Sequence, residues 1–201
     1  MNSRPAAPEP AVPNPAPNPA PNPAAPNPVA PDHDSVRSTP RSPGPSRTEP
    51  PQGELLLPDT ADTEALGERL ARGLGAGDLV VLAGPLGAGK TALVRGLARG
   101  LGVAGPVTSP TFVIAREHRP LPGGAGVPLV HVDAYRLGST GSDIAAELDD
   151  LDLDTELDGA VLAVEWGEGV VERLSARHLL VRLDRRPDDV RTATVRWVER
   201  N

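Results

Sequence analysis

Apolar residues recur in a regular pattern along this chain only from residue 53 onwards. A short apolar run, LLL at 55–57, precedes three leucines at four-residue spacing, and this spacing predicts an amphipathic helix over 62–75. Thr60 or Asp62 is expected to cap that helix, because both side chains can accept hydrogen bonds from the first backbone amides. The folded part of the chain therefore begins with a short apolar run and a helix.

Short continuous apolar runs predict buried strands in the rest of the chain. The first, DLVVLA at 78–83, leads through a glycine-rich segment into a helix whose apolar residues lie on one side and which Gly102 ends. Further strands are predicted at 112–116, 129–133, 161–165, 178–183 and 192–198. Because strands alternate with helices, we predict an α/β domain with a mainly parallel sheet flanked by helices.

The first 52 residues have a different composition. They contain the near-repeat PNPAPNPAPNPAAPNP, and 17 of the 25 prolines fall within the first 51 positions. Such a segment cannot bury enough apolar area to offset its chain entropy. We predict a disordered, Pro/Ala/Asn-rich tail over 1–52 and one folded domain over 53–201.

Net charge and the lack of cysteine exclude several kinds of binding site. The net charge is -7, which argues against direct binding of nucleic acid, so any role with RNA is expected to be indirect. The absence of cysteine excludes disulfides and thiolate metal sites and fits a reducing compartment. No secretory signal begins the sequence and no apolar stretch approaches 18 residues, so we expect a cytoplasmic protein with no membrane partner.

The segment GPLGAGKT at 84–91 satisfies the pattern G-x-x-x-x-G-K-[ST]. Its glycines let the backbone curl so that successive N–H groups, with the positive end of the following helix, point at phosphates. Lys90, the only lysine in the chain, is expected to neutralise the β and γ phosphates, and the Thr91 hydroxyl to take one position around Mg²⁺. The fold expected is therefore P-loop NTPase-like.

Hydrolysis also needs carboxylates, and two predicted strands end in one. Glu165 follows the apolar run VLAV and is the candidate for the Mg²⁺ shell. Asp133 ends the strand LVHVD and is the candidate for positioning water or the γ-phosphate, unless it only forms a strand-end turn. His131, in the same strand, is interpreted as a structural residue.

The acidic segment before Glu165 allows two other interpretations. Residues 154–165 nearly fit a calcium-loop pattern, but the run GAVLAV before Glu165 favours a buried strand instead. The other acidic residues, over 143–158, form either a solvated face or a surface for a basic partner.

Four motifs, GPLGAGKT, VTSPTF, HVDAYR and VEWGE, resemble in this order the TsaE family, the bacterial P-loop ATPase of tRNA threonylcarbamoyladenosine (t6A) biosynthesis. The resemblance covers about residues 55–184. It implies a compact α/β ATPase with ATP and Mg²⁺ as cofactors, and it implies binding to the TsaD and TsaB proteins. Their complex installs threonylcarbamoyl on an adenosine beside the anticodon, with ATP hydrolysis supporting repeated turnover.

The same resemblance implies roles for individual residues. Lys90, Asp133 and Glu165 are the implied catalytic residues, and Thr91 and Glu165 the implied Mg²⁺ ligands. Residues 108–111 resemble a switch-type loop. The implied nucleotide-binding residues are Thr63, Gly87, Ala88, Gly89, Lys90, Thr91, Ala92, Asp133 and Trp166.

The sequence departs from the family pattern at two positions of the loop. Pro85 stands where the family usually has Asp, which bears on loop stiffness and turnover, and Ala92 stands where a second Thr is common. 

Our first hypothesis is therefore a Mg²⁺-dependent accessory ATPase that is weakly active alone. A small-molecule kinase, with arginines of the segment 182–191 around an acceptor, and a nucleotide-dependent interaction switch are the alternatives.

Overall fold

The computed structural model describes residues 49–51, 53–110, 115–124, 126–137 and 144–200. Apart from 49–51, the predicted tail lies outside the described residues, as does the start of the strand predicted at 112–116. No helix in the described part is long and apolar enough to cross a membrane.

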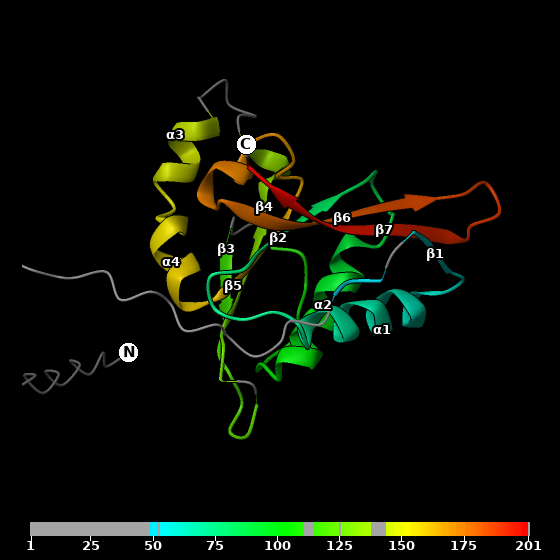
Figure 1. Ribbon diagram of the computed structural model, residues 1–201, viewed down its shortest axis with the longest axis horizontal. Helices are drawn as coiled ribbons and strands as arrows, with labels where there is room; N and C mark the ends of the chain where they lie inside the picture. The colour runs from blue at the N-terminus through cyan, green and yellow to red at the C-terminus, as the bar shows by residue number, and fades with distance from the viewer. Residues whose placement is uncertain (1–48, 52, 111–114, 125, 138–143, 201) are drawn as a thin grey trace, which may run out of the picture. The chain divides into compact units, whose positions relative to one another are not determined.

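The described chain forms a seven-stranded sheet with the order β1-β7-β6-β2-β5-β4-β3 (Figure 1). The four central strands, β6, β2, β5 and β4, pair in parallel, which confirms the predicted parallel core. The outer pairs β1/β7, β6/β7 and β3/β4 are antiparallel. A short turn joins β6 to β7 and so requires that sense, whereas β1 pairs with β7 although the two strands lie at opposite ends of the domain sequence. The strands are β1 Glu54–Leu57, β2 Leu79–Ala83, β3 Ala115–His118, β4 Leu129–Asp133, β5 Val161–Glu165, β6 Arg177–Arg185 and β7 Arg191–Glu199.

Helices cover both faces of this sheet. Helices α1 and α2 pack on one face, and α4 packs on the other (Figure 1). The bounds are α1 Thr60–Ala71, α2 Lys90–Leu101, α3 Ile144–Asp149 and α4 Leu153–Gly159, with 3₁₀ turns η1 Ala134–Arg136 and η2 Val171–Leu174.

Helix α1 starts and ends differently from the sequence-based expectation. Its N-cap is Asp59, whose carboxylate accepts from the Asp62 amide at 2.9 Å while the Asp62 carboxylate accepts from the Asp59 amide at 3.1 Å. The predicted cap was therefore wrong: Thr60 is the first residue of the helix, and Asp62 is the reciprocal partner in a capping box. The helix ends at Ala71, before Gly73 and Gly75, because glycine weakens a helix interior.

Strand β2 shows why a continuous apolar run predicts a central strand. Val80 and Leu82 face α1 and α2, whereas Leu79, Val81 and Ala83 belong to the core beneath α4. Both faces of the strand are buried, so every position is apolar. The loop after β2 begins where the strand ends, at the carboxyl edge of the parallel strands. Ligands bind at this edge in folds of this kind.

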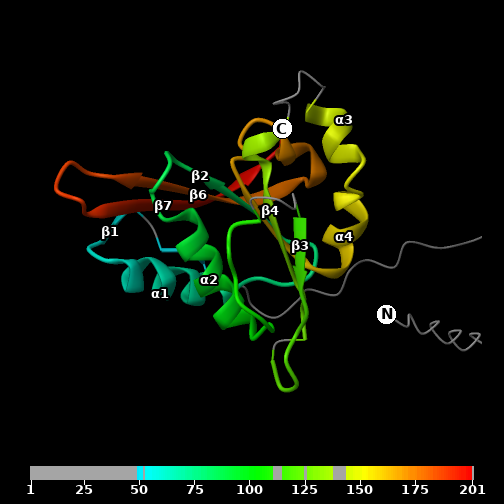
Figure 2. The ribbon, with the colours of Figure 1, turned by 180° about the vertical axis from the view of Figure 1, so that it is seen from behind.

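Helices α1 and α2 touch backbone to backbone (Figure 2). A Cβ atom placed on Gly67 would lie 2.2 Å from the Leu93 carbonyl oxygen, and one placed on Gly96 would lie 2.0 Å from the Glu64 carbonyl oxygen. Real Cβ atoms do not approach backbone this closely, so only glycine fits at these crossings. The contact fixes α1 rigidly against the helix that follows the glycine-rich loop.

We expect Gly96→Ala to lower the free energy of unfolding by about 2 kcal/mol, because the added methyl group must push the two helices apart. Urea denaturation of the variant measures this loss. Gly159→Ala is the matched control, since nothing lies within 4 Å of a Cβ there. Equal stabilities of the two variants would contradict the tight helix contact.

Candidate functional site

The loop 84–89 joins β2 to α2 and depends on its glycines. Gly84, Gly87 and Gly89 have φ values of 134°, 80° and 106°, a region that side chains other than hydrogen disfavour. A Cβ on Gly84 would also lie 2.1 Å from the Leu183 carbonyl oxygen. Gly89 is the N-cap of α2 and offers no side chain, so the first amides of the helix remain available to an anion.

Lys90 folds back over this loop. Its Nζ donates to the Gly84 carbonyl at 2.8 Å and to the Pro85 carbonyl at 2.9 Å, and it lies 3.6 Å from the centroid of the Trp166 ring. Burial lowers the pKa of Lys90, while the carboxylates of Glu165 and Asp133 act in the opposite direction. The ammonium group is thus held by neutral carbonyls that phosphate oxygens can replace.

Glu165 is a buried carboxylate at the end of β5, with 3% of its surface exposed. Its Oε1 accepts from the Thr91 hydroxyl at 2.8 Å and from His131 Nε2 at 2.9 Å. His131 is fully buried, and its Nδ1 has no hydrogen-bond partner among the described residues, so we assign the tautomer that carries the proton on Nε2. Both donors converge on one oxygen, which leaves Oε2 without a hydrogen bond from either of them.

Asp133, at the end of β4, uses both of its oxygens. Oδ1 accepts from the Tyr135 amide at 3.1 Å and caps η1, as the strand-end turn interpretation requires. Oδ2 accepts from the Ser109 hydroxyl at 2.8 Å and points towards the loop 107–110. The turn and the site interpretations of this residue are therefore compatible.

A cavity of about 620 Å³ opens above the glycine-rich loop, within the size range of small-ligand sites. It brings together most of the site residues named from the sequence, and its lining also includes Ser109 and Pro110 of the switch-like loop together with Leu86, Arg95 and Tyr135. The sequence-predicted residues that line it are Gly87, Gly89, Lys90, Thr91, Ala92, Asp133, Glu165 and Trp166.

Two predicted residues lie outside this lining. Ala88 is fully buried beneath the loop. Thr63 is fully buried on α1, where its hydroxyl donates to the Asp59 carbonyl at 3.3 Å. Its methyl group would lie 3.3 Å from a Cβ on Gly89, so Thr63 packs against the outside of the loop.

Two aromatic rings stand at the edge of the cavity. The Tyr135 and Trp166 ring centroids are 5.0 Å apart at an interplanar angle of 52°. Trp166 has a φ of 63°, an unusual conformation for a bulky residue, and its ring reaches over Lys90. Tyr135 is 65% exposed and Leu86 87% exposed, so the rim is apolar and open to solvent.

The sequence suggested Arg185 and Arg191 only for the kinase alternative and gave Arg95 no role, although all three lie near the loop or its cavity. A Cβ on Gly89 would lie 3.2 Å from Arg191 Cδ, and a Cβ on Gly87 would lie 3.6 Å from Arg185 Nη1. Arg185 and Arg191 face each other at the end of the β6–β7 hairpin, so their placement follows from the hairpin register. Arg95 lies four residues after Thr91, a spacing that places both side chains on one face of a helix.

The donor set suits Mg²⁺. Within the described residues there is no cluster of three or more His, Asp or Glu side chains that could form an all-protein metal cage. A hydroxyl from Thr91 and carboxylates from Glu165 and Asp133 instead line one cavity. Mg²⁺ is commonly bound by one or two carboxylates together with phosphate oxygens and water, which this arrangement allows. Residues of the calcium-like pattern lie instead on α4 and on the buried strand β5.

The parallel sheet, the glycine-rich loop after β2 and the carboxylates at the neighbouring strand ends define an α/β protein of the P-loop NTPase-like class. The sequence model of the family "Threonylcarbamoyl adenosine biosynthesis protein TsaE" matches residues 57–193, and the chain belongs to this family.

Several curated relatives share the name "tRNA threonylcarbamoyladenosine biosynthesis protein TsaE". The Mycobacterium tuberculosis protein is 56% identical over 147 residues, which cover 72% of this chain and 87% of the relative. The Bacillus subtilis protein is 37% identical over 134 residues, 66% of this chain and 78% of the relative. Among solved structures, Bacillus subtilis YdiB superposes with a TM-score of 0.57 at 30% identity, covering 75% of this chain and 88% of that one.

His131 offers a test of the Glu165 geometry. We expect His131→Leu to lower the free energy of unfolding by about 1–3 kcal/mol, because the buried carboxylate loses one of its two donors. His131→Gln keeps an N–H group and should lose less. Urea denaturation of both variants measures the difference, and a fully stable Leu variant would show that the contact is dispensable.

The single lysine allows its pKa to be measured directly. In protein labelled with ¹³C-lysine, we expect the Cε resonance to titrate below the ordinary value of 10.5, because burial favours the neutral amine. Adding adenosine diphosphate should raise this pKa, since phosphate charge favours the ammonium form. By linkage, diphosphate binding should weaken as the pH rises through the pKa of the free protein. A midpoint at or above 10.5 in the free protein would contradict the buried geometry.

Proposed function

We propose that this chain is a Mg²⁺-dependent ATPase that serves as an accessory subunit in threonylcarbamoyl modification of a tRNA adenosine, acting with the TsaB–TsaD complex. Membership of a family named for threonylcarbamoyl adenosine biosynthesis supports the pathway. The observation that carries the catalytic part is the convergence of Lys90, Thr91, Asp133 and Glu165 on one cavity above a GxxxxGKT loop.

The residues have distinct roles in this proposal. The loop amides and the N-terminus of α2 cradle the phosphates, and Lys90 exchanges the Gly84 and Pro85 carbonyls for phosphate oxygens. Thr91 and Glu165 would hold Mg²⁺, which when bound neutralises charge on the phosphate oxygens. Asp133 accepts a hydrogen bond from water or orients the γ-phosphate, and Trp166 flanks the nucleotide.

The open rim supports weak activity in isolation. The exposed side chains of Leu86 and Tyr135 leave the cavity accessible to water. A partner that covers them would exclude water and strengthen every electrostatic contact inside. The net charge of -7 fits a protein that meets tRNA only through such a complex, and we place this complex in the cytoplasm.

The kinase alternative gains little from the arginines near the loop. Arg182 pairs with Glu168, Arg185 pairs with Asp189 at 3.0 Å, and Arg186 pairs with Asp188 at 3.1 Å. These three paired arginines are poor recruits for an acceptor substrate. Arg191 differs from them, because its buried Nε has no hydrogen-bond partner among the described residues. Product analysis separates the two activities, because hydrolysis releases inorganic phosphate whereas a kinase yields a phosphorylated acceptor.

We expect Lys90→Ala and Glu165→Gln each to reduce ATP turnover at least about 100-fold, because each removes a charge that the reacting phosphates require. Phosphate release is measured with and without purified TsaB and TsaD, which should stimulate the wild-type chain. Glu117→Gln is the control, since Glu117 pairs only with Arg119 in the described structure and does not line the cavity. Full turnover in the Lys90 variant, or no uptake of adenine nucleotide by the wild-type chain in calorimetry, would refute the assignment.

A further inference from the structure

The loop 104–110 runs from the end of α2 back to the cavity and is tied down at several points. The Ala104 amide donates to the Arg119 carbonyl at 2.7 Å, and Val107 packs into the core beneath α1 and α2. Nearer the cavity, the Ser109 hydroxyl donates to Asp133 Oδ2 at 2.8 Å. The position of this loop therefore bears directly on the orientation of a carboxylate in the site.

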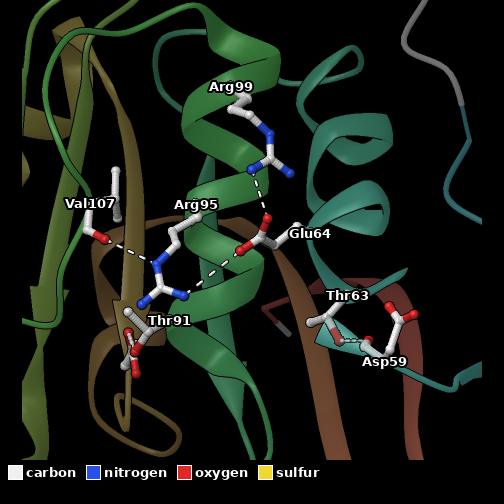
Figure 3. Close-up of polar contacts among 8 residues, drawn as sticks. Asp59, Thr63, Glu64, Thr91, Arg95, Arg99 and Val107 are labelled. Atoms are coloured by element: carbon white, nitrogen blue, oxygen red, sulfur yellow. Dashed lines mark hydrogen bonds and ion pairs between the residues drawn. The ribbon is translucent and has the colours of Figure 1, made fainter. Parts of the chain in front are cut away.

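Arg95 is the residue of α2 that reaches this loop (Figure 3). It lies one helical turn beyond Thr91 and lines the same cavity. Its Nε donates to the Val107 carbonyl at 3.2 Å, and its Nη1 lies 3.7 Å from the Glu64 carboxylate. The planar fork of a guanidinium can serve both partners at once, which a lysine ammonium cannot do in the same geometry.

The two contacts of Arg95 differ in strength. The Arg95 side chain is 45% exposed, so its long ion pair with Glu64 is screened by water and contributes little. Glu64 is moreover held more closely by Arg99, at 2.7 Å (Figure 3). The bond to Val107 is a charge-assisted hydrogen bond to a backbone carbonyl that belongs to a buried residue. It adds a polar link between α2 and the loop to the packing of Val107 in the core.

We propose that Arg95 is a positioning residue of the nucleotide site. By holding the Val107 carbonyl, it keeps Ser109, two residues further along the chain, where the serine hydroxyl donates to Asp133. Through these two bonds, Arg95 couples the orientation of Asp133 on β4 to the position of α2, the helix that carries Thr91. The expected effect of Arg95 on ATP turnover rests on the proposed function. Its hydrogen bond to the Val107 carbonyl does not, because that bond is present in the protein without nucleotide.

The first measurement is hydrogen–deuterium exchange of the peptide covering 104–110, without nucleotide. Arg95→Met keeps the apolar stem but removes the donor, so exchange of this peptide should become faster than in the wild type. Arg99→Met is the matched control, because it removes the closer Glu64 pair and leaves the Val107 bond intact. Glu64→Gln tests the ion pair by itself. Both controls should exchange like the wild type, and Arg95→Ala serves if the Met variant does not fold.

The second measurement separates kcat from KM for ATP. A misplaced Asp133 should lower kcat about five- to tenfold, the size expected from the loss of one such hydrogen bond, with KM changed less than about twofold. Arg95→Lys keeps a donor and should recover part of the loss. In the double variant with Ser109→Ala, the two effects should not add, because Arg95 acts through Ser109.

The outcomes test the positioning role of Arg95 separately from the proposed function. Unchanged exchange in Arg95→Met, or equally fast exchange in Arg99→Met or Glu64→Gln, would overturn the inference whatever the protein catalyses. Additive losses with Ser109→Ala would overturn the route through Asp133. Failure of the wild-type chain to bind adenine nucleotide would instead refute the proposed function and leave the exchange result intact.

Discussion

A carboxylate buried at the carboxyl edge of the sheet is the constraint on which the site depends. Glu165 ends a strand with both faces covered, and its surface is 3% exposed. A charge in that position needs donors, because burial without them costs several kcal/mol. Thr91 from α2 and His131 from β4 supply them, so one side chain determines how a helix and two strands meet.

The parts of this arrangement that are local in sequence could be predicted. The run DLVVLA, the glycine-rich loop and the following helix form one continuous segment, and Asp133 and Glu165 each end an apolar strand. Because parallel strands end at the same edge, these carboxylates were expected near the loop without any knowledge of the sheet order.

The parts that depend on pairing between distant segments could not be predicted. His131 was interpreted as a structural residue, and its bond to Glu165 follows only from the parallel register in which Asp133 lies opposite Glu165. The approach of Arg191 to Gly89 depends in the same way on the hairpin register. The antiparallel outer strands and the cap at Asp59 were missed because turn lengths and exact helix starts are weakly encoded.

The departures of the loop from its family pattern have a physical meaning in this structure. Pro85 has no backbone N–H group, so this loop offers one donor fewer than a loop with aspartate at that position. Its carbonyl nevertheless receives the Lys90 ammonium. Ala92 is buried and lines the cavity beside Thr91, and its methyl group lacks the hydroxyl that a threonine would bring there.

The scarcity of lysine has a consequence for chemical modification of this protein. Every other basic side chain apart from histidine is an arginine, so Lys90 holds the one ε-amino group of the chain. Acetylation or any other acylation of a lysine side chain would therefore occur inside the loop and remove its positive charge. For this protein, every lysine modification would therefore be a change at the glycine-rich loop.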